Sequence, residues 1–396
     1  MSSTLAQKSQ KSRGQYLHEP RVLKIEARDL QPVAADHIRV AIRATTICGS
    51  DVHYYTQFAN GSIQVREALC LGHEAAGRVV EVGSPSAGLH LKVGDAVALE
   101  CGVPCGECMY CRGGRYNICP DLRFRSSGSK FPHYQGTLQE FVDHPAKWAH
   151  RLPPELGFDV GALLEPLAVA VHAVRRVGQD TMSSRKGCLV FGAGAVGLMC
   201  AVAARADGCQ DVAMVDIDRG RLAFALRHGF ASVVYAAEPK RGESLQEKLD
   251  IARETATEVE KLEWPHGEPV GRLQRTFECT GAESCVQSSI YATASGGSVV
   301  LVGMGIPNHT LPVSEMTTRE INLVSTWRYA GAYPRAIEIA RASVTGTLLN
   351  GMALPDISWM ITHRFRGIDA VPTALETAGK TRDSDGELVV KTVVNF

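Results

Sequence analysis

The sequence predicts an α/β protein with two domains, one rich in strands and one built on a doubly wound parallel sheet. At 396 residues, the chain is longer than one hydrophobic core ordinarily accommodates. Residues 20–165 alternate short apolar runs with glycine and proline, a pattern typical of strands joined by loops. From Lys186 onward, strand-like and helix-like segments alternate, which indicates a parallel sheet with helices on both faces.

Composition narrows the class of protein. Forty-two basic residues balance forty-two acidic residues, so no net field would recruit nucleic acid or an anionic membrane. The first twenty residues lack the apolar core of a secretory signal, and no uncharged apolar run reaches the ~18 residues of a membrane span. We therefore expect a cytoplasmic protein whose twelve cysteines are thiols or metal ligands and not disulfides.

The second half of the chain has the clearest periodicity. A buried strand is expected at CLVFG (188–192), a helix at AVGLMCAVAARA (195–206) and a second strand at DVAMVDID (211–218). A final strand is expected at LVVKTVVNF (388–396). Residues 238–272 are polar and charged, and we interpret them as a crossover helix followed by an enlarged surface loop.

Four cysteines lie within fifteen residues at the spacing C-x2-C-x2-C-x7-C. They are Cys105, Cys108, Cys111 and Cys119. Two-residue gaps let thiolates converge on one ion while backbone amides face the sulfurs, and four thiolates complete the tetrahedral shell of a structural zinc. An iron–sulfur cluster is the main alternative, because its ligand spacing can be similar.

A glycine-rich G-x-G-x-x-G segment joins the first strand of this region to its helix. It comprises Gly192, Gly194 and Gly197. The first two allow a tight turn and a close approach of pyrophosphate to the helix N-terminus, and the third allows the helix to pack against the strand. Asp216 follows nineteen residues later, where it would accept hydrogen bonds from the adenosine ribose. Its charge repels a 2′-phosphate, so we expect NAD and not NADP, although Arg221 could serve such a phosphate.

Other potential metal ligands are scattered along the chain. They are Cys48 in ICGSDVH, His73 and Glu74 in LGHEAAG, and Glu165 in LLEPLAVAVH. A catalytic zinc needs about three protein ligands and an open position. No spacing rule links these residues, and each taken singly is more typical of an ordinary buried or solvated side chain.

Six segments occur in an order typical of one enzyme family: ICGSDVHYY, GHEAAGRVVEVG, the four-cysteine lobe, LLEPLAVAVHA, GAGAVG and FECTGAE. Over roughly residues 20–396 the chain resembles the zinc-containing medium-chain dehydrogenases, in particular the sorbitol, xylitol and L-arabinitol dehydrogenase branch. The resemblance implies a GroES-like, β-rich catalytic domain at 20–165 and 326–396, and a Rossmann NAD-binding domain at 166–325. It also implies a flexible tail at 1–19 and a homotetramer, with a homodimer as the alternative.

The resemblance assigns residues to a catalytic zinc. Cys48 and His73 match zinc ligands, and the counterpart of Glu74 in polyol dehydrogenases binds zinc directly or through water. Glu165 stands where the family's alcohol dehydrogenases supply a second cysteine. A carboxylate there makes zinc a harder Lewis acid and leaves an oxygen that can orient a substrate hydroxyl. Asp51 is expected to orient His73, as metal-bound histidines usually require.

The same resemblance assigns a proton relay and contacts to substrate and cofactor. Ser50 and His53 stand where related enzymes place a hydroxyl and an imidazole, although a plain surface histidine is the alternative for His53. The expected substrate contacts are Tyr54, Phe124, Glu165, Arg328 and Tyr329. The expected cofactor contacts, besides the glycines and Asp216, are Val196, Arg221, Val302, Gly303, Met304, Thr326 and Arg328. A guanidinium suits vicinal hydroxyls, but Arg328 could equally form an interface salt bridge.

Together these features predict a dehydrogenase with two zinc ions per chain that oxidises a secondary alcohol of a polyol to the ketose, reversibly and with NAD. Its expected partner is a small-molecule alcohol such as L-arabinitol, xylitol or sorbitol. Loop 125–136 and the long segment 238–272 leave a less polar alcohol or a diol as an alternative substrate. An alternative from another class is a catalytically silent protein that binds zinc and dinucleotide.

Overall fold

The structure is a computed structural model that describes residues 11–84, 91–177 and 187–396. The chain divides into two compact units: Met1–Glu165 together with Ile361–Phe396, and Pro166–Met360. Among the described residues, none of the helices combines the length and the apolar character needed to cross a membrane.

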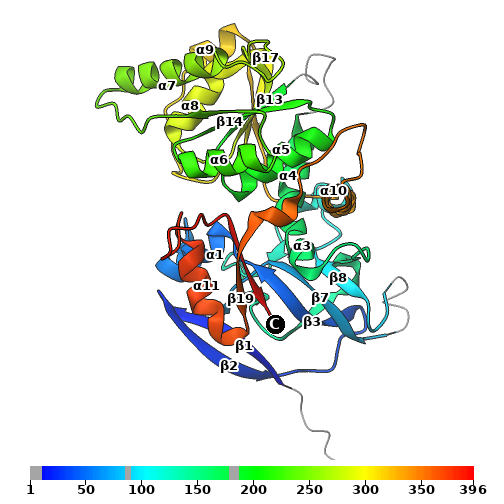
Figure 1. Cartoon of the computed structure of the whole chain (residues 1–396). Coiled ribbons are helices and arrows are strands. Elements are labelled where there is room, and N and C mark those ends of the chain that lie inside the picture. Colours follow the sequence, from blue (N-terminus) through cyan, green and yellow to red (C-terminus); the bar gives the residue numbers. More distant parts are fainter. Residues whose placement is uncertain (1–10, 85–90, 178–186) are drawn as a thin grey trace, which may run out of the picture. The chain divides into compact units, whose positions relative to one another are not determined.

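The first unit is built mainly from antiparallel strands (Figure 1). Its seven-stranded sheet has the order β12-β8-β7-β3-β20-β19, and β11 also pairs with β3. The sheet strands are β3 (His37–Thr46), β7 (Glu74–Val82), β8 (Ala96–Leu99), β11 (Phe141–Pro145), β12 (Ala149–Arg151), β19 (Ile361–Arg366) and β20 (Lys391–Asn395). A three-stranded sheet contains β1 (Lys11–Glu19), β2 (Val22–Asp29) and β6 (Leu69–Cys70).

Short elements complete this unit. The helices are α1 (Gly49–Gln57), α2 (Met109–Arg112), α3 (Phe158–Ala162) and α11 (Val371–Ala378). Two strand pairs are β4 (Ala59–Asn60) with β5 (Ile63–Gln64), and β9 (Gly102–Val103) with β10 (Arg123–Phe124). Central strand β3 is buried along most of its length because it pairs with β7, β11 and β20.

The flexible tail predicted at 1–19 is wrong for residues 11–19, which form strand β1. Tyr16 and Leu17 are almost completely buried in the core of the first unit. The segment KSRGQYLHE has only two consecutive apolar residues, so its strand depends on partners elsewhere in the chain. Residues 1–10 lie outside the described part of the structure.

The second unit contains a six-stranded sheet in which every neighbouring pair is parallel. Its order, β15-β14-β13-β16-β17-β18, is the 3-2-1-4-5-6 order of the doubly wound dinucleotide-binding fold. The strands are β13 (Gly187–Phe191), β14 (Asp211–Asp216), β15 (Val233–Ala236), β16 (Leu273–Glu278), β17 (Thr293–Leu301) and β18 (Asn322–Ser325). The predicted fold class, a β-rich domain plus a doubly wound α/β domain, is confirmed.

Helices cover both faces of this sheet. In Figure 1, α5 and α6 lie on one side of it, and α7 and α8 lie on the other. The helices of the unit are α4 (Leu164–Arg176), α5 (Ala195–Ala206), α6 (Arg219–Arg227), α7 (Leu245–Glu260), α8 (Glu283–Ala292), α9 (Val313–Thr318) and α10 (Tyr333–Thr345). Because both faces are covered, β13 is buried at every position, which explains its uninterrupted apolar sequence.

The boundary expected at residue 326 differs from the structure, in which the chain returns to the first unit at Ile361. Two side chains of residues 326–360 contact the C-terminal end of α5. Arg335 Nη2 and Asn350 Nδ2 both donate hydrogen bonds to the carbonyl of Ala206, at 2.8 and 2.9 Å. These contacts join residues more than a hundred positions apart, so the local pattern of α10 does not reveal them.

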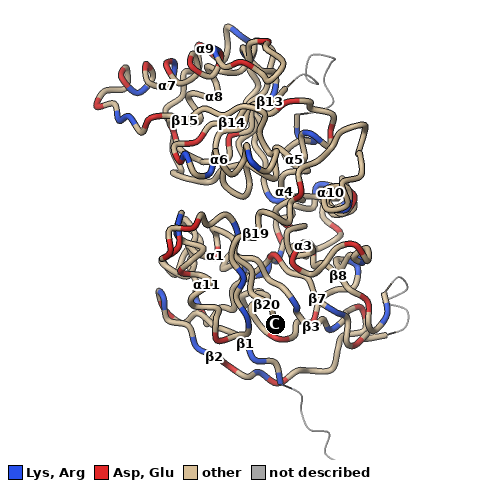
Figure 2. Tube along the Cα trace, in the orientation of Figure 1, with Lys and Arg blue, Asp and Glu red and all other residues tan. Residues whose placement is uncertain are grey.

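The segment predicted as a crossover helix and surface loop does form helix α7, capped by reciprocal hydrogen bonds between Ser244 and Glu247. Its exposed side carries charges of both signs (Figure 2). The loop that follows is not only a surface loop, because Trp264 is 6% exposed and belongs to the core that α7 forms with the sheet. A Cβ added at Gly187 would lie 2.8 Å from the Trp264 ring.

Replacing Trp264 tests this packing. We expect Trp264→Ala to lower the free energy of unfolding of the second unit by about 3–5 kcal/mol, because a large aromatic side chain leaves a cavity. Trp359 is 58% exposed, so Trp359→Ala is a matched control that should cost about 1 kcal/mol or less. Urea unfolding followed by circular dichroism measures both, and equal losses would contradict the assignment of the loop to the core.

Candidate active site and metal centres

The four cysteines of the lobe converge around α2. The Sγ atoms of Cys105 and Cys111 lie 3.9 Å apart, those of Cys108 and Cys111 3.4 Å, and those of Cys105 and Cys119 3.6 Å. Sulfurs bound at ~2.3 Å to a tetrahedral ion would lie ~3.8 Å from one another, whereas a disulfide would bring two of them to ~2.05 Å. The observed spacing therefore fits a four-thiolate metal site.

Backbone amides face these sulfurs. The N–H of Cys108 donates to Sγ of Cys105 at 3.4 Å, and the N–H of Cys105 donates to Sγ of Cys119 at 3.5 Å. Hydrogen bonds from the amides of Glu107 and Cys108 lower the pKa of Cys105 to about 7, which favours the thiolate that a metal requires. With four protein donors the lobe has no open position for a substrate, so it suits a structural ion.

A second cluster joins Cys48, His73 and Glu74. Cys48 directly precedes α1, and Glu74 begins β7, where it pairs with Thr46 of β3. One potential ligand atom from each of the three lies within 4.8 Å of the others. Residues far apart in sequence are thus assembled by the central sheet into a mixed sulfur, nitrogen and oxygen donor set of the kind that catalytic zinc sites use.

Asp51 lies completely buried beside His73, with its Oδ1 3.3 Å from Nδ1 of the imidazole. The contact is an ion pair without the alignment of a hydrogen bond. Although burial lowers the pKa of His73, the negative charges of Asp51 and Cys48 raise it well above its usual value. This surplus of negative charge suits a bound cation, which would take the place of the imidazole proton.

Lys391 is a site residue that the sequence patterns did not single out. Its Nζ donates to Glu74 at 2.6 Å and to the carbonyl of Ile47 at 3.0 Å, and the Thr46 hydroxyl also donates to Glu74. Burial lowers the pKa of Lys391, but Glu74, with smaller contributions from Cys48 and Glu165, more than offsets this and raises the pKa above its usual value. The available signal was a lone lysine inside the apolar run LVVKTVVNF, because a charge in a buried strand requires a partner.

The other predicted catalytic residues lie outside this three-residue cluster. Glu165 is buried in the first turn of α4 and is not among the donors within 4.8 Å, although its charge helps to raise the pKa of Lys391. Ser50 and His53 lie on α1, where Ser50 is half-buried and His53 is exposed. The exposure of His53 suits proton exchange with water and also fits the alternative of a surface histidine.

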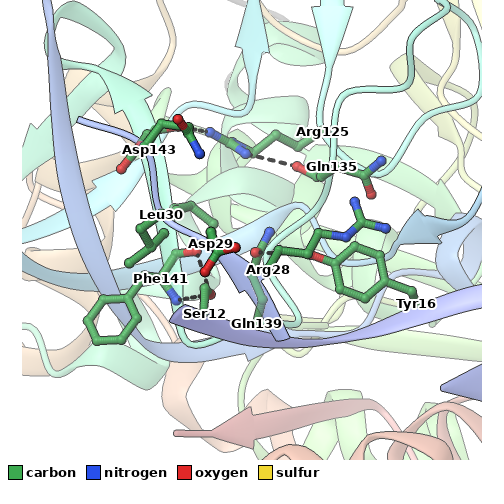
Figure 3. Close-up of a pocket in the computed structure, with 12 residues that line it drawn as sticks. Ser12, Tyr16, Arg28, Asp29, Leu30, Arg125, Gln135, Gln139, Phe141 and Asp143 are labelled. Carbon is green, nitrogen blue, oxygen red and sulfur yellow. Dashed lines mark hydrogen bonds between the residues drawn. The ribbon is translucent and has the colours of Figure 1, made fainter. Parts of the chain in front are cut away.

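Two predicted substrate contacts, Tyr54 and Phe124, lie in the same unit. The ring centroid of Phe124 is 5.3 Å from that of His73, and Tyr54 is buried with its hydroxyl accepting a hydrogen bond from the N–H of Gly128 at 3.2 Å. A pocket of about 250 Å³ in this unit is lined by Tyr16, Arg28 and neighbouring residues (Figure 3). It contains none of the predicted site residues, so it is not the candidate active site.

The glycine-rich turn follows β13 in the second unit. Gly192 has φ 98°, which side chains rarely permit, and a Cβ at Gly197 would lie 1.8 Å from the carbonyl oxygen of Gly192. Gly194 precedes α5, and Val196 is half-buried in the first turn of that helix. The unpaired amides at a helix start attract phosphate, so this turn has the form of a dinucleotide site.

Asp216 ends β14 and lies against that turn. Its Oδ2 accepts a hydrogen bond from the N–H of Ala193 at 2.6 Å, and its Oδ1 accepts one from the N–H of Asp218 at 2.8 Å. Each carboxylate oxygen retains a lone pair that can accept a ribose hydroxyl. The Arg221 side chain also lies against the glycine-rich turn, since its Nη1 would lie 3.9 Å from a Cβ added at Gly194.

The remaining predicted cofactor and substrate residues follow two strands of the same unit. Val302 and Gly303 both donate backbone hydrogen bonds to the carbonyl of Glu278 at 2.8 Å, whereas Met304 is 63% exposed. After β18 come Thr326, Arg328 and Tyr329. Arg328 has φ 49°, and its guanidinium carbon lies 4.8 Å from the centroid of the Trp327 ring. Tyr329 is buried against Tyr333. The hydroxyl of Thr326 is buried and has no hydrogen-bond partner in the described structure.

The predicted site residues thus form two sets. Residues of the first unit surround the metal donors, and residues of the second unit surround the glycine-rich turn and the ends of β17 and β18. Glu278 was missed by sequence reasoning. It is completely buried, and its carboxylate accepts hydrogen bonds from the N–H groups of Thr280 and Gly281 at about 3 Å, which shapes the turn after β16.

Comparison with known proteins assigns a family model to each of the two units. Residues 34–154 match the family model of the alcohol dehydrogenase GroES-like domain, and residues 195–342 match that of the zinc-binding dehydrogenases. A sorbitol dehydrogenase from Arabidopsis thaliana is 35% identical over 94% of this chain and 92% of its own length. An L-arabinitol 4-dehydrogenase from Penicillium rubens is also 35% identical, over 88% of this chain and 83% of its own length.

Solved structures agree. An oxidoreductase/dehydrogenase of unknown specificity from Escherichia coli superposes with a TM-score of 0.79 at 28% identity, covering 98% of this chain and 99% of that one. The donor clusters, the dinucleotide fold and these relatives lead to one conclusion. The chain belongs to the zinc-containing medium-chain dehydrogenase family and is a dehydrogenase similar to the polyol dehydrogenases of that family.

Proposed function

We propose that this enzyme binds one catalytic and one structural zinc ion and oxidises a secondary alcohol of a polyol to the ketose, reversibly and with NAD. The favoured substrates are of the L-arabinitol, xylitol or sorbitol type. The observation that carries the proposal is the cluster of Cys48, His73 and Glu74, whose three donors leave room for a substrate oxygen on a shared cation. Relatives named sorbitol dehydrogenase and L-arabinitol 4-dehydrogenase support the choice of substrate class.

The residues around the cluster have distinct roles in this proposal. A zinc ion held by Cys48, His73 and Glu74 would act as a Lewis acid that lowers the pKa of a substrate hydroxyl, which is the chemistry that hydride transfer to nicotinamide requires. Asp51 orients the imidazole of His73, and Lys391 holds the carboxylate of Glu74. The hydroxyl of Ser50 accepts the substrate proton as it passes its own proton to His53, and His53, being exposed, releases a proton to water.

Selectivity for a polyol rests on hydrogen-bonding side chains. Glu165 supplies a carboxylate where alcohol dehydrogenases of the family have a cysteine, and it can accept a hydrogen bond from a second substrate hydroxyl. Arg328 offers a planar array of donors that suits vicinal hydroxyls. Polar groups of this kind favour a polyol over an apolar alcohol, because they lose their hydrogen-bond partners when an apolar alcohol displaces water from them.

Metal analysis tests the two zinc sites. Purified wild-type protein should contain two zinc ions per chain, and Cys48→Ala should retain one while its turnover falls by about 1,000-fold, which corresponds to about 4 kcal/mol of lost transition-state stabilisation. Cys111→Ser is the matched control and should lose the other ion. A wild-type protein with one zinc that survives Cys48→Ala would instead support a catalytically silent relative.

Cofactor choice is tested at Asp216. In Asp216→Asn, the side chain keeps an acceptor for the N–H of Ala193 but loses the charge that repels a 2′-phosphate. The ratio of kcat/KM with NAD to kcat/KM with NADP should fall by about 10-fold or more, as expected for loss of a charged hydrogen bond. Asp218→Ala removes the cap of α6 and serves as the control, since it should leave that ratio unchanged. An unchanged ratio in Asp216→Asn would refute the assigned role.

A substrate panel tests the polyol assignment. With NAD and the zinc-loaded enzyme, kcat/KM for L-arabinitol, xylitol or sorbitol should exceed that for butan-2-ol and cyclohexanol by about 100-fold or more. Arg328→Ala should narrow this difference, because it should lower kcat/KM for the polyols and leave kcat/KM for the apolar alcohols unchanged. Activity confined to the apolar alcohols would exclude the polyol assignment while leaving the zinc chemistry intact.

A further inference from the structure

Loop 125–136, which lies between β10 and β11, is held closed by contacts between its two ends. The N–H of Ser126 donates to the carbonyl of Tyr134 at 2.9 Å, and Ser127 forms an isolated antiparallel bridge with Tyr134. Arg125 Nη1 donates to the carbonyl of Gln135 at 2.8 Å (Figure 3). The two ends of the loop are therefore held together at three successive positions.

Arg125 also anchors the loop to the main sheet. The Arg125 side chain is 3% exposed, its Nη2 donates to the carbonyl of Asp143 at 2.5 Å, and its Nε donates to Nδ1 of His144 at 3.2 Å. Both partners lie in β11, which pairs with the central strand β3. These hydrogen bonds fix the position of the backbone at Arg125, and therefore also the point from which residue 126 continues.

That residue, Ser126, has a backbone conformation that is uncommon for a residue with a side chain. Its φ is 62°, in the left-handed region, and it is 2% exposed. In this conformation its hydroxyl donates a hydrogen bond to Oδ1 of Asp51 at 2.6 Å. Such a conformation persists where the surrounding structure determines it, and it often marks a functional site.

Asp51 receives hydrogen bonds from three segments of the chain. Besides the Ser126 hydroxyl, Oδ1 accepts the N–H of Gly72 at 3.0 Å, and Oδ2 accepts the N–H of Cys48 at 3.1 Å. Gly72 and Cys48 are backbone donors with fixed places, so they cannot be varied by side-chain replacement. Ser126 differs because its donor is a side-chain hydroxyl, which can be replaced. It donates to Oδ1 of Asp51, the same oxygen that lies 3.3 Å from Nδ1 of His73.

We propose that Ser126 is a positioning residue for the catalytic metal: its hydroxyl fixes the Asp51 carboxylate beside Nδ1 of His73, which leaves Nε2 of that imidazole for the ion. This inference rests on the proposed metal at Cys48 and His73. Hydrogen bonding to the second nitrogen of a metal-bound histidine sets its tautomer and orientation, and loss of such outer partners typically weakens metal binding by about 10–100-fold.

The next residues of the loop serve a different partner. The Ser127 hydroxyl lies 3.4 Å from the hydroxyl of Tyr54, and the N–H of Gly128 donates to the same Tyr54 oxygen at 3.2 Å. Ser127 is buried to the same degree as Ser126 but makes no hydrogen bond to Asp51 among the described contacts. The two adjacent serines therefore provide a matched pair for mutagenesis. Ser126 contacts Asp51 beside the metal-binding cluster, and Ser127 contacts Tyr54, a predicted substrate contact.

The test compares Ser126→Gly, Ser126→Ala and Ser127→Ala. Glycine removes the hydroxyl and adopts positive φ readily, so any loss in Ser126→Gly cannot be ascribed to backbone strain. In chelator competition, the ion of the Cys48 site should bind about 10–100-fold more weakly in both Ser126 variants than in wild type. The d–d spectrum of cobalt loaded into that site should change as well. Ser127→Ala should retain the wild-type affinity and spectrum, and raise KM through Tyr54.

The four-cysteine ion is an internal control, since its retention reports that the first unit is folded. Wild-type metal affinity and an unchanged cobalt spectrum in both Ser126 variants would overturn the positioning role. Equal metal loss in Ser127→Ala would overturn it too, because the effect would then belong to the loop as a whole. Failure of the proposed function has a different signature, namely a wild-type protein that binds no ion dependent on Cys48.

Discussion

The geometry of the candidate active site depends on one buried carboxylate, Asp51. Taking a carboxylate out of water costs several kcal/mol unless hydrogen bonds and opposite charge compensate it. Here the amides of Cys48 and Gly72, the hydroxyl of Ser126 and the imidazole of His73 provide that compensation. Burial alone would raise the pKa of Asp51, but His73, Ser126 and Gly72 lower it. Three segments of the first unit must converge for this to happen: residues 48–51, residues 72–73 and Ser126. The burial of the Asp51 carboxylate is therefore coupled to the placement of Cys48 and His73.

A second buried charge pair links the end of the chain to the same site. Lys391 of β20 and Glu74 of β7 flank the central strand β3, whose Thr46 and following Ile47 complete their hydrogen bonds. Removing either partner would strand a buried charge, which is strongly destabilising. This pairing gives a physical reason for the chain to return to the first unit after the dinucleotide-binding unit: the last strand supplies the cation that the Glu74 carboxylate needs.

Features with local causes were predictable. The four-cysteine lobe follows from two-residue spacings, and α5 begins and ends as its glycine cap and apolar periodicity predict. Features with distant causes were not. Strand β1 has little apolar pattern of its own and forms because β2 and β6 pair with it. Trp264 lies in a segment whose sequence predicts a polar loop, yet its side chain is buried in the core of the second unit. Residues 326–360 were misassigned for the same reason, since α5 holds them through side chains that no local pattern marks.

The sequence by itself determined the two-domain α/β class, the four-cysteine lobe and the glycine-rich turn, because short-range spacing and periodicity encode each of them. Resemblance to a family was needed to associate Cys48, His73 and Glu74, since no spacing rule joins them. Only the tertiary structure decided how they are held: Lys391 on Glu74, and Ser126 with Asp51 on His73. These partners lie up to 317 positions apart, and a buried charge reveals its partner only after the chain has brought the two together.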